Sequence, residues 1–142
     1  MRQIMKWTMG LSMLLLAVTS MAAEGFKLVV NEKNGLSSLS QTEVSAMLLK
    51  KSARWPDGTR VTAVDQVGGS EVRDAMSRQI HGRTSAAVRS YWQQQIFSGR
   101  DVPPVEKNSD EQVLAFVRAN PGAIGYVSPS ASTAGVKVLV VR

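Results

Sequence analysis

One short segment of the chain combines the residue types of an anion-binding loop. Gly68, Gly69 and Ser70 follow an apolar run, and Glu71 and Arg73 open the next periodic segment. Backbone N–H groups and the positive end of a helix dipole attract anions at such a junction, and a serine hydroxyl adds a donor. The same residues serve as turn and N-cap residues where nothing binds. The Gly-Lys-Ser/Thr ending of a nucleotide-binding P-loop is absent from the sequence.

Residues for catalysis are sparse. His81 is the only histidine, there is no cysteine, and the carboxylates are dispersed along the sequence. Because His81 directly precedes Gly82, we expect it at a helix end, facing solvent or the helix dipole. No nucleophile, base and metal set emerges, so we predict that the protein is not an enzyme and has neither a metal site nor a cofactor.

The N-terminus has the three parts of a cleavable secretion signal. Arg2 and Lys6 form a positive region, residues 11–18 (LSMLLLAV) form an apolar region, and residues 20–23 are small enough for cleavage after Ala22 or Ala23. A spanning helix needs roughly 20 apolar residues, so we expect no membrane span after cleavage. The sequence therefore predicts a signal peptide over residues 1–23 and one periplasmic domain over residues 24–142.

Composition and charge limit the classes of molecule that this domain is expected to bind. The formal charge of +6 falls to about +4 when Arg2 and Lys6 leave with the signal, and the remaining basic residues are scattered. Nucleic-acid binding is therefore not expected, whereas a small anion is compatible with this surface. Without cysteine there is no disulfide, so the core alone must stabilise the fold.

Four strands and four helices are expected. The strands are predicted at residues 26–31, 61–65, 123–127 and 136–141, which are rich in β-branched residues and bounded by turn formers. Ser40 with Glu43, and Ser109 with Gln112, have the spacing of capping boxes. Ser70 and Ser85 are the expected N-caps of the two helices between them. Trp55 precedes the turn Pro56-Asp57-Gly58, where we favour a structural role over one in lining a cleft.

Apolar periodicity defines the predicted inner faces of these helices. Apolar residues recur at helical spacing in each helix-like segment, and seven of them are expected to face one core: Val44, Met47, Leu48, Val72, Met76, Val113 and Phe116. The same spacing places Ile80 and Val117 on the apolar faces of their helices, and Val88, Tyr91, Trp92 and Ile96 on one face of another, where Tyr91 and Trp92 are expected in the core. Helices and strands in mixed order favour an α/β fold: a single domain with a mixed β-sheet flanked by helices.

Three segments, in matching order and spacing, resemble the phosphate-binding proteins of bacterial ABC importers, which have the type II periplasmic binding protein fold. They are residues 39–58, which include the stretch Arg54-Trp55-Pro56-Asp57-Gly58; the loop over residues 64–70; and residues 120–127 (NPGAIGYV). The resemblance covers nearly all of the predicted mature chain. Since a full receptor is about twice as long, it implies one lobe of such a protein, the second, with a strand and helix of the first.

The resemblance implies a site for phosphate or another oxyanion at Gly68, Gly69, Ser70, Glu71 and Arg73. The family's Ser-Gly-Thr cradle corresponds to Gly69-Ser70-Glu71 here, and Asp65-Gln66 stand where the family has an arginine. Arg73 is the candidate substitute, unless it pairs with Glu71 or Asp74.

The family's first anion loop has no counterpart, unless residues 31–38 replace it. An ABC permease or another envelope protein is the implied partner. The alternative function is a periplasmic interaction module that kept the scaffold and lost anion binding.

Overall fold

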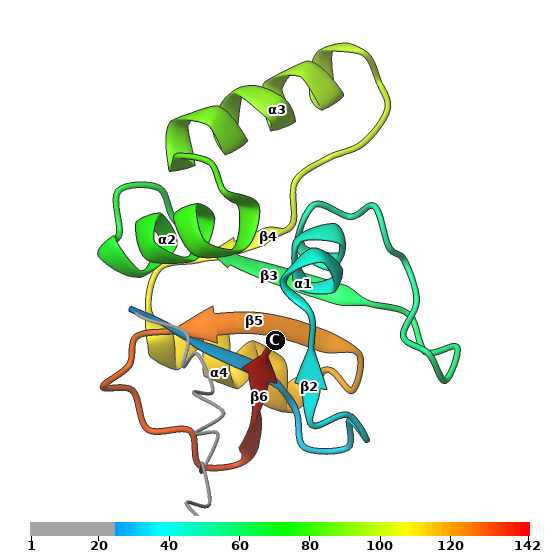
Figure 1. The fold of residues 1–142 in the computed structure, drawn as a ribbon, viewed down its shortest axis with the longest axis vertical. Helices are drawn as coiled ribbons and strands as arrows, with labels where there is room; N and C mark the ends of the chain where they lie inside the picture. Colours follow the sequence, from blue (N-terminus) through cyan, green and yellow to red (C-terminus); the bar gives the residue numbers. More distant parts are fainter. Residues whose placement is uncertain (1–24) are drawn as a thin grey trace, which may run out of the picture.

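A six-stranded mixed sheet runs through the centre of the domain (Figure 1). The computed structural model describes residues 25–142, so the predicted signal peptide lies outside the described residues. The strands are β1 (Lys27–Asn31), β2 (Ser38–Leu39), β3 (Thr62–Gln66), β4 (Val105–Lys107), β5 (Ala123–Val127) and β6 (Val136–Val141). The predicted α/β fold with a mixed sheet is confirmed.

The strand order is β2-β6-β1-β5-β3-β4. β1 lies antiparallel between β5 and β6, whereas β3 runs parallel to both β5 and β4. Val30 at the end of β1 therefore pairs with Ile124 at the start of β5, which also pairs with Ala63 near the start of β3. The loops after β1 and after β3 consequently leave opposite ends of the sheet.

The helices are α1 (Gln41–Leu48), α2 (Glu71–Met76), α3 (Ser85–Phe97) and α4 (Asp110–Ala119), and α2 continues as a π-helical turn, η1 (Ser77–His81). The Ser40–Glu43 capping box is confirmed on α1. On α4, Ser109 Oγ caps Gln112 N as predicted, but Gln112 Oε1 accepts from Asn108 N instead of closing the box on Ser109.

The sheet separates two apolar clusters, so the prediction of one common core was wrong. α1, α2 and η1 pack on one face through Val44, Met47, Leu48, Val72, Met76 and Ile80. α4 covers the other face, where Val113 and Val117 are fully buried and Phe116 packs at the edge. Alternation along β5 explains this, because Ile124 and Tyr126 belong to the first cluster and Val127 to the second.

Two glycines of the segment 120–127 allow close packing. A β-carbon on Gly125 would lie 2.6 Å from Val64 Cγ1 and 3.1 Å from Val113 Cγ1, so α4 approaches β5 across a missing side chain. A β-carbon on Gly122 would lie 2.0 Å from the carbonyl oxygen of Arg60. Trp55 is buried and donates from Nε1 to Gly122 O at 2.9 Å, so it has the structural role that we favoured, and it also lines a cavity.

α3 stands apart from the sheet at one end of the long axis (Figure 1). It rests on η1 and on Leu49, against which Val88 and Trp92 pack; Tyr91 is only partly buried. The predicted N-cap Ser85 was wrong by one residue: Thr84 Oγ1 caps Ala87 N, and Ser85 Oγ donates to Asp74 Oδ1 of α2. Ile96, which helical spacing places on the same face as Val88 and Trp92, is 52% exposed.

Candidate functional site

The junction between β3 and α2 has the backbone geometry of a helix N-terminus. Gly69 has φ +89°, a conformation that glycine adopts without steric cost. Ser70 is the N-cap, and its Oγ accepts from Arg73 N at 3.2 Å. The first N–H groups of a helix lack partners within it, so those of Glu71 and Val72 have no acceptor inside α2. A hydroxyl that accepts one hydrogen bond can still donate its own proton, so Ser70 Oγ retains a donor.

Arg89 of α3 lies over this loop and was not predicted from the sequence. A β-carbon placed on Gly68 would lie 3.3 Å from Arg89 Nη2, so the guanidinium lies close to the glycine. Arg89 is exposed and forms no ion pair with any residue of the range 25–142. The loop of Gly68, Gly69 and Ser70 is therefore flanked by a cation whose charge is not neutralised by a neighbouring carboxylate.

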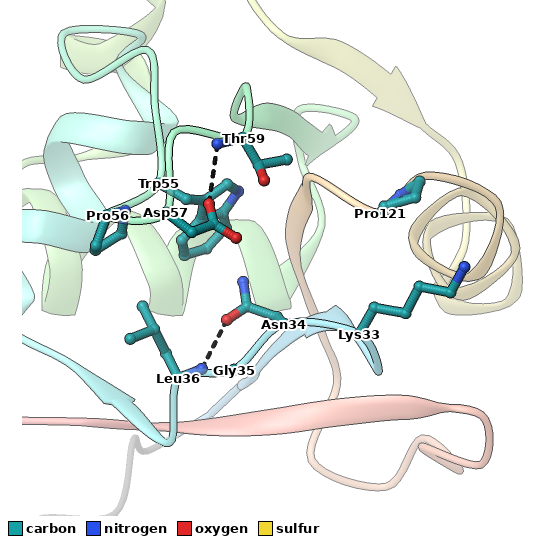
Figure 2. A pocket seen from close by; sticks show the side chains of 9 residues that line it. All are labelled: Lys33, Asn34, Gly35, Leu36, Trp55, Pro56, Asp57, Thr59 and Pro121. Atoms are coloured by element: carbon teal, nitrogen blue, oxygen red, sulfur yellow. Dashed lines mark hydrogen bonds between the residues drawn. The ribbon is translucent and has the colours of Figure 1, made fainter.

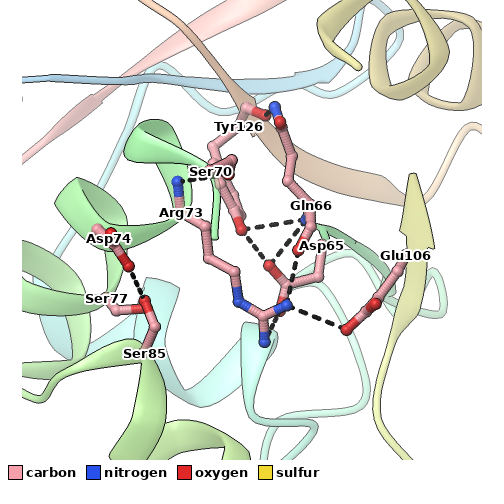
Figure 3. A network of polar contacts seen from close by, with 9 residues as sticks. All are labelled: Asp65, Gln66, Ser70, Arg73, Asp74, Ser77, Ser85, Glu106 and Tyr126. Atoms are coloured by element: carbon pink, nitrogen blue, oxygen red, sulfur yellow. Dashed lines mark hydrogen bonds and ion pairs between the residues drawn. The ribbon is translucent and has the colours of Figure 1, made fainter. Parts of the chain in front are cut away.

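Arg73 belongs instead to a buried polar network behind the loop (Figure 3). Its Nη1 donates to Glu106 Oε1 at 3.0 Å and to Gln66 O at 2.7 Å, and its Nη2 lies 3.7 Å from Asp65 Oδ2. From the sequence we considered an ion pair of Arg73 with Glu71 or Asp74, and the structure shows neither pair. Burial lowers the pKa of Arg73, but Asp65 and Glu106 outweigh it, so the pKa is raised and the residue stays charged.

Asp65 and Tyr126 form the deepest part of this network. Tyr126 donates its hydroxyl proton to Asp65 Oδ1, and Gln66 N donates to the same carboxylate oxygen at 2.9 Å. Desolvation raises the pKa of Asp65 in spite of the opposing Arg73, and burial beside that carboxylate raises the pKa of Tyr126. The arrangement holds β3, β5 and α2 together and offers no group to an external ligand, since these side chains are almost inaccessible.

The five residues predicted as the site divide into two groups. Gly68, Gly69, Ser70 and Glu71 are consecutive on the loop surface, and the side chain of Arg73 points away from them into the network. Glu71 is exposed in the first turn of α2, where its carboxylate favours the helix dipole and opposes an approaching anion. An oxyanion at the loop would therefore meet backbone donors, the Ser70 hydroxyl and Arg89, with Glu71 as the repulsive neighbour.

His81 lies in a different environment from the one expected. It ends η1 before Gly82, as predicted, but it is partly buried and its Nδ1 lies 2.8 Å from Ser45 Oγ of α1. Burial, assisted by the charges of Arg83, Lys51 and Arg73, lowers the pKa of His81 from 6.5 to about 4. The imidazole is consequently neutral at pH 7 and links α1 to η1.

A cavity of about 500 Å³ lies at the other end of the sheet (Figure 2). Residues of the β1–β2 loop and of the turn after Trp55 line it, together with Pro121: Lys33, Asn34, Gly35, Leu36, Trp55, Pro56, Asp57 and Thr59. Asp57 Oδ1 accepts from Thr59 N and Asn34 Oδ1 from Leu36 N, both at 2.9 Å, so these oxygens stabilise their own turns. Because residues 31–38 leave the opposite end of the sheet from Gly68–Ser70, they do not complete an anion site there.

Solved structures of phosphate-binding transport proteins share this fold. A putative phosphate ABC transporter substrate-binding protein with bound phosphate from Clostridium perfringens superposes with a TM-score of 0.66 at 20% identity, over 82% of this chain and 44% of that one. An ABC-type phosphate transport receptor from Vibrio cholerae gives 0.62 at 18% identity, over 82% and 46%. A possible phosphate binding protein from Planctomyces limnophilus gives 0.61 at 14% identity, over 83% and 41%.

These similarities establish the fold and the extent of the match. The chain spans less than half the length of each of these three structures and corresponds to one lobe of such a protein. No protein-family model matches the sequence, and no curated protein matches it. Within residues 25–142, no helix has the length and apolar character needed to cross a membrane.

Proposed function

We propose that residues 24–142 form an exported, periplasmic solute-binding domain that binds a small oxyanion, with inorganic phosphate as the first candidate. The observation that carries the proposal is the close approach of Arg89 to Gly68, which places an unneutralised cation beside a glycine-containing helix N-terminus. Solved structures with the same fold include phosphate transport proteins, one of them with bound phosphate, which is consistent with this ligand class.

In this proposal the loop and Arg89 make different contributions to oxyanion binding. The Ser70 hydroxyl and the N–H groups of Gly69, Glu71 and Val72 donate to the oxyanion, and Arg89 supplies the charge that a phosphate oxygen needs. Arg73 is a positioning residue, because it links α2 to β3 and β4 through ion pairs with Asp65 and Glu106. Glu71 weakens binding through like-charge repulsion.

Isothermal titration of the protein with phosphate, and separately with sulfate, tests the proposal. Ser70→Ala should weaken phosphate binding about tenfold or more, since a hydrogen bond to a charged group contributes roughly 1.5–3 kcal/mol. The same substitution removes an N-cap at a cost of about 1 kcal/mol in stability, so thermal unfolding must be measured alongside. Ser109→Ala removes the N-cap of α4 in the same way, and it should leave phosphate binding unchanged. Native protein that releases no binding heat at millimolar oxyanion would contradict the proposal.

Delivery of the bound solute to an ABC permease is the second part of the proposal. The chain covers less than half of each of these structures, so in this proposal it supplies one wall of the site of such a receptor. Copurification with a permease from the envelope, lost when the protein fails to bind phosphate, would support that role.

The second candidate function is an interaction module without a ligand. It is favoured by Glu71, whose exposed carboxylate lies where an anion would dock, and by the neutralisation of Arg73. This module should bind its envelope partner equally well with and without phosphate, and Arg89→Gln should leave that binding unchanged. A partner interaction that depends on phosphate would exclude it.

A further inference from the structure

The end of α3 presents apolar side chains to solvent. Phe97 is 92% exposed, Ile96 52% and Val102 60%, and the exposed Arg100 lies between them in the chain. We call these four residues the α3 tip. α3 and the turn after it form one extremity of the domain along its long axis, away from the sheet (Figure 1). The α3 tip is therefore a protrusion with exposed aromatic and aliphatic side chains. These side chains do not pack into the core, so packing of the fold gives no reason for their apolar character.

α3 and the turn after it are basic. Residues 85–100 contain Arg89 and Arg100 but no aspartate or glutamate. The next carboxylate, Asp101, is paired with Lys50 at 3.2 Å. The tip consequently carries net positive charge beside its apolar groups, a combination typical of protein segments that lie on anionic membranes.

An open hollow of about 460 Å³ lies beside Phe97. Gln94, Gln95, Ser98 and Arg100 line it together with the Phe97 ring. Side-chain amides and a guanidinium suit a phosphodiester, and Arg binds phosphate oxygens through two parallel hydrogen bonds. A lipid phosphate in this hollow would lie beside the exposed Phe97 ring.

We propose that the α3 tip docks on the surface of an anionic phospholipid bilayer, without spanning it. We favour a bilayer over an acidic protein because a bilayer deforms around a protruding Phe97 side chain, whereas a protein partner would need a pocket of matching shape. A second copy of the chain would bring two positive tips together across a symmetric interface, which is electrostatically unfavourable. This inference does not depend on oxyanion binding at Gly68–Ser70.

Cosedimentation with vesicles tests the proposal. The probe is phosphatidylcholine vesicles, with and without phosphatidylglycerol, and the protein is expressed from its full sequence and used in the processed form that the cell makes. We expect binding to the vesicles with phosphatidylglycerol, weakened by salt, and little binding to phosphatidylcholine alone. Phe97→Ser should weaken binding about tenfold or more, and Arg100→Gln about fivefold.

Matched substitutions away from the tip control for general loss of apolar surface and charge. Val140→Ser and Arg60→Gln each change an exposed residue elsewhere and should leave vesicle binding unchanged. Since native protein and variants share one N-terminus, their difference reports on the tip, and because Phe97 is 92% exposed its replacement should preserve the thermal midpoint. Equal vesicle binding by native protein and Phe97→Ser would overturn the proposal. A native protein that does not bind phosphatidylglycerol would also overturn the proposal if Phe97 were instead needed to form a dimer or a complex with an acidic protein.

Discussion

Arg73 Nη1 on α2 lies 3.0 Å from Glu106 Oε1 on β4, although 33 residues separate the two in sequence. Together with the contact to Asp65, this ion pair anchors α2 against two adjacent parallel strands. The loop of Gly68, Gly69 and Ser70 is thereby held at the end of β3. The charge of Arg73 serves the fold, and the charge available to a ligand belongs to Arg89.

Removing the Arg73 guanidinium should destabilise the domain strongly. Arg73→Met leaves Asp65 buried without its cation, and breaking a buried pair in this way costs about 3–5 kcal/mol. Arg78→Met, at an exposed position on η1, should cost under about 0.5 kcal/mol. Urea unfolding measures both, and adding Asp65→Asn to Arg73→Met should restore part of the loss. Similar stabilities of the Arg73 and Arg78 variants would show that the network is not needed for stability.

Gly125 should tolerate no side chain. Gly125→Ala places a β-carbon 2.6 Å from Val64 Cγ1, and overpacking of this kind costs about 1–3 kcal/mol. Gly35→Ala is the matched control, because no atom lies within 4 Å of the corresponding β-carbon. Thermal unfolding should show a lower midpoint for Gly125→Ala alone, partly recovered by Val64→Ala. An unchanged midpoint in Gly125→Ala would contradict the close packing of α4 on β5.

Stability should fall in mild acid because of His81. Its pKa is lowered to about 4 in the folded state, so between pH 6.5 and 4 the unfolded chain binds a proton that the folded protein excludes. The free energy of unfolding should therefore fall by up to about 3 kcal/mol as the pH drops through this window. His81→Gln should remove that part of the pH dependence, as measured by urea unfolding at pH 7 and pH 4.5. Parallel pH profiles for native protein and variant would refute the assignment.

Local sequence signals predicted most of the fold. The Ser40–Glu43 capping box, the Ser70 cap and the four longer strands follow from residue type and spacing within a few positions. The short strands β2 and β4 were missed because each depends on pairing with a distant partner, β6 and β3, more than on its own two or three residues. The separation of α4 onto its own sheet face was missed because helical periodicity marks an apolar face without specifying which side of a sheet it covers.

The candidate site was predicted less completely for a related reason. The loop over Gly68–Ser70 is a continuous segment, so its turn and cap residues are visible in the sequence. Arg89 reaches Gly68 from a different helix, and Arg73 turns to Asp65 and Glu106, so both placements depend on tertiary packing. Only the absence of acidic residues from 75 to 100 signalled that cations in this region lack nearby partners in sequence.

Replacing Glu71 should strengthen oxyanion binding. Glu71→Thr removes a negative charge from the first turn of α2 and adds a hydroxyl donor, so phosphate affinity should rise about fivefold or more, equivalent to about 1 kcal/mol. Glu111→Thr changes an exposed carboxylate in the first turn of α4 and should leave the affinity unchanged. Isothermal titration gives both values. If Glu71→Thr also fails to bind any oxyanion at millimolar concentration, the loop is not a binding site.

The central claim is that phosphate binds at the Gly68–Ser70 loop beside Arg89, and amide-resolved NMR tests it most directly. On titration with phosphate, the amide signals of residues 68–72 and the Arg89 side-chain signal should shift together, and those of residues 33–36 at the opposite cavity should not. Arg89→Gln should weaken the response about tenfold or more, whereas Arg83→Gln should leave it unchanged. Shifts confined to the cavity around Trp55, or no shifts at millimolar phosphate, would contradict the account.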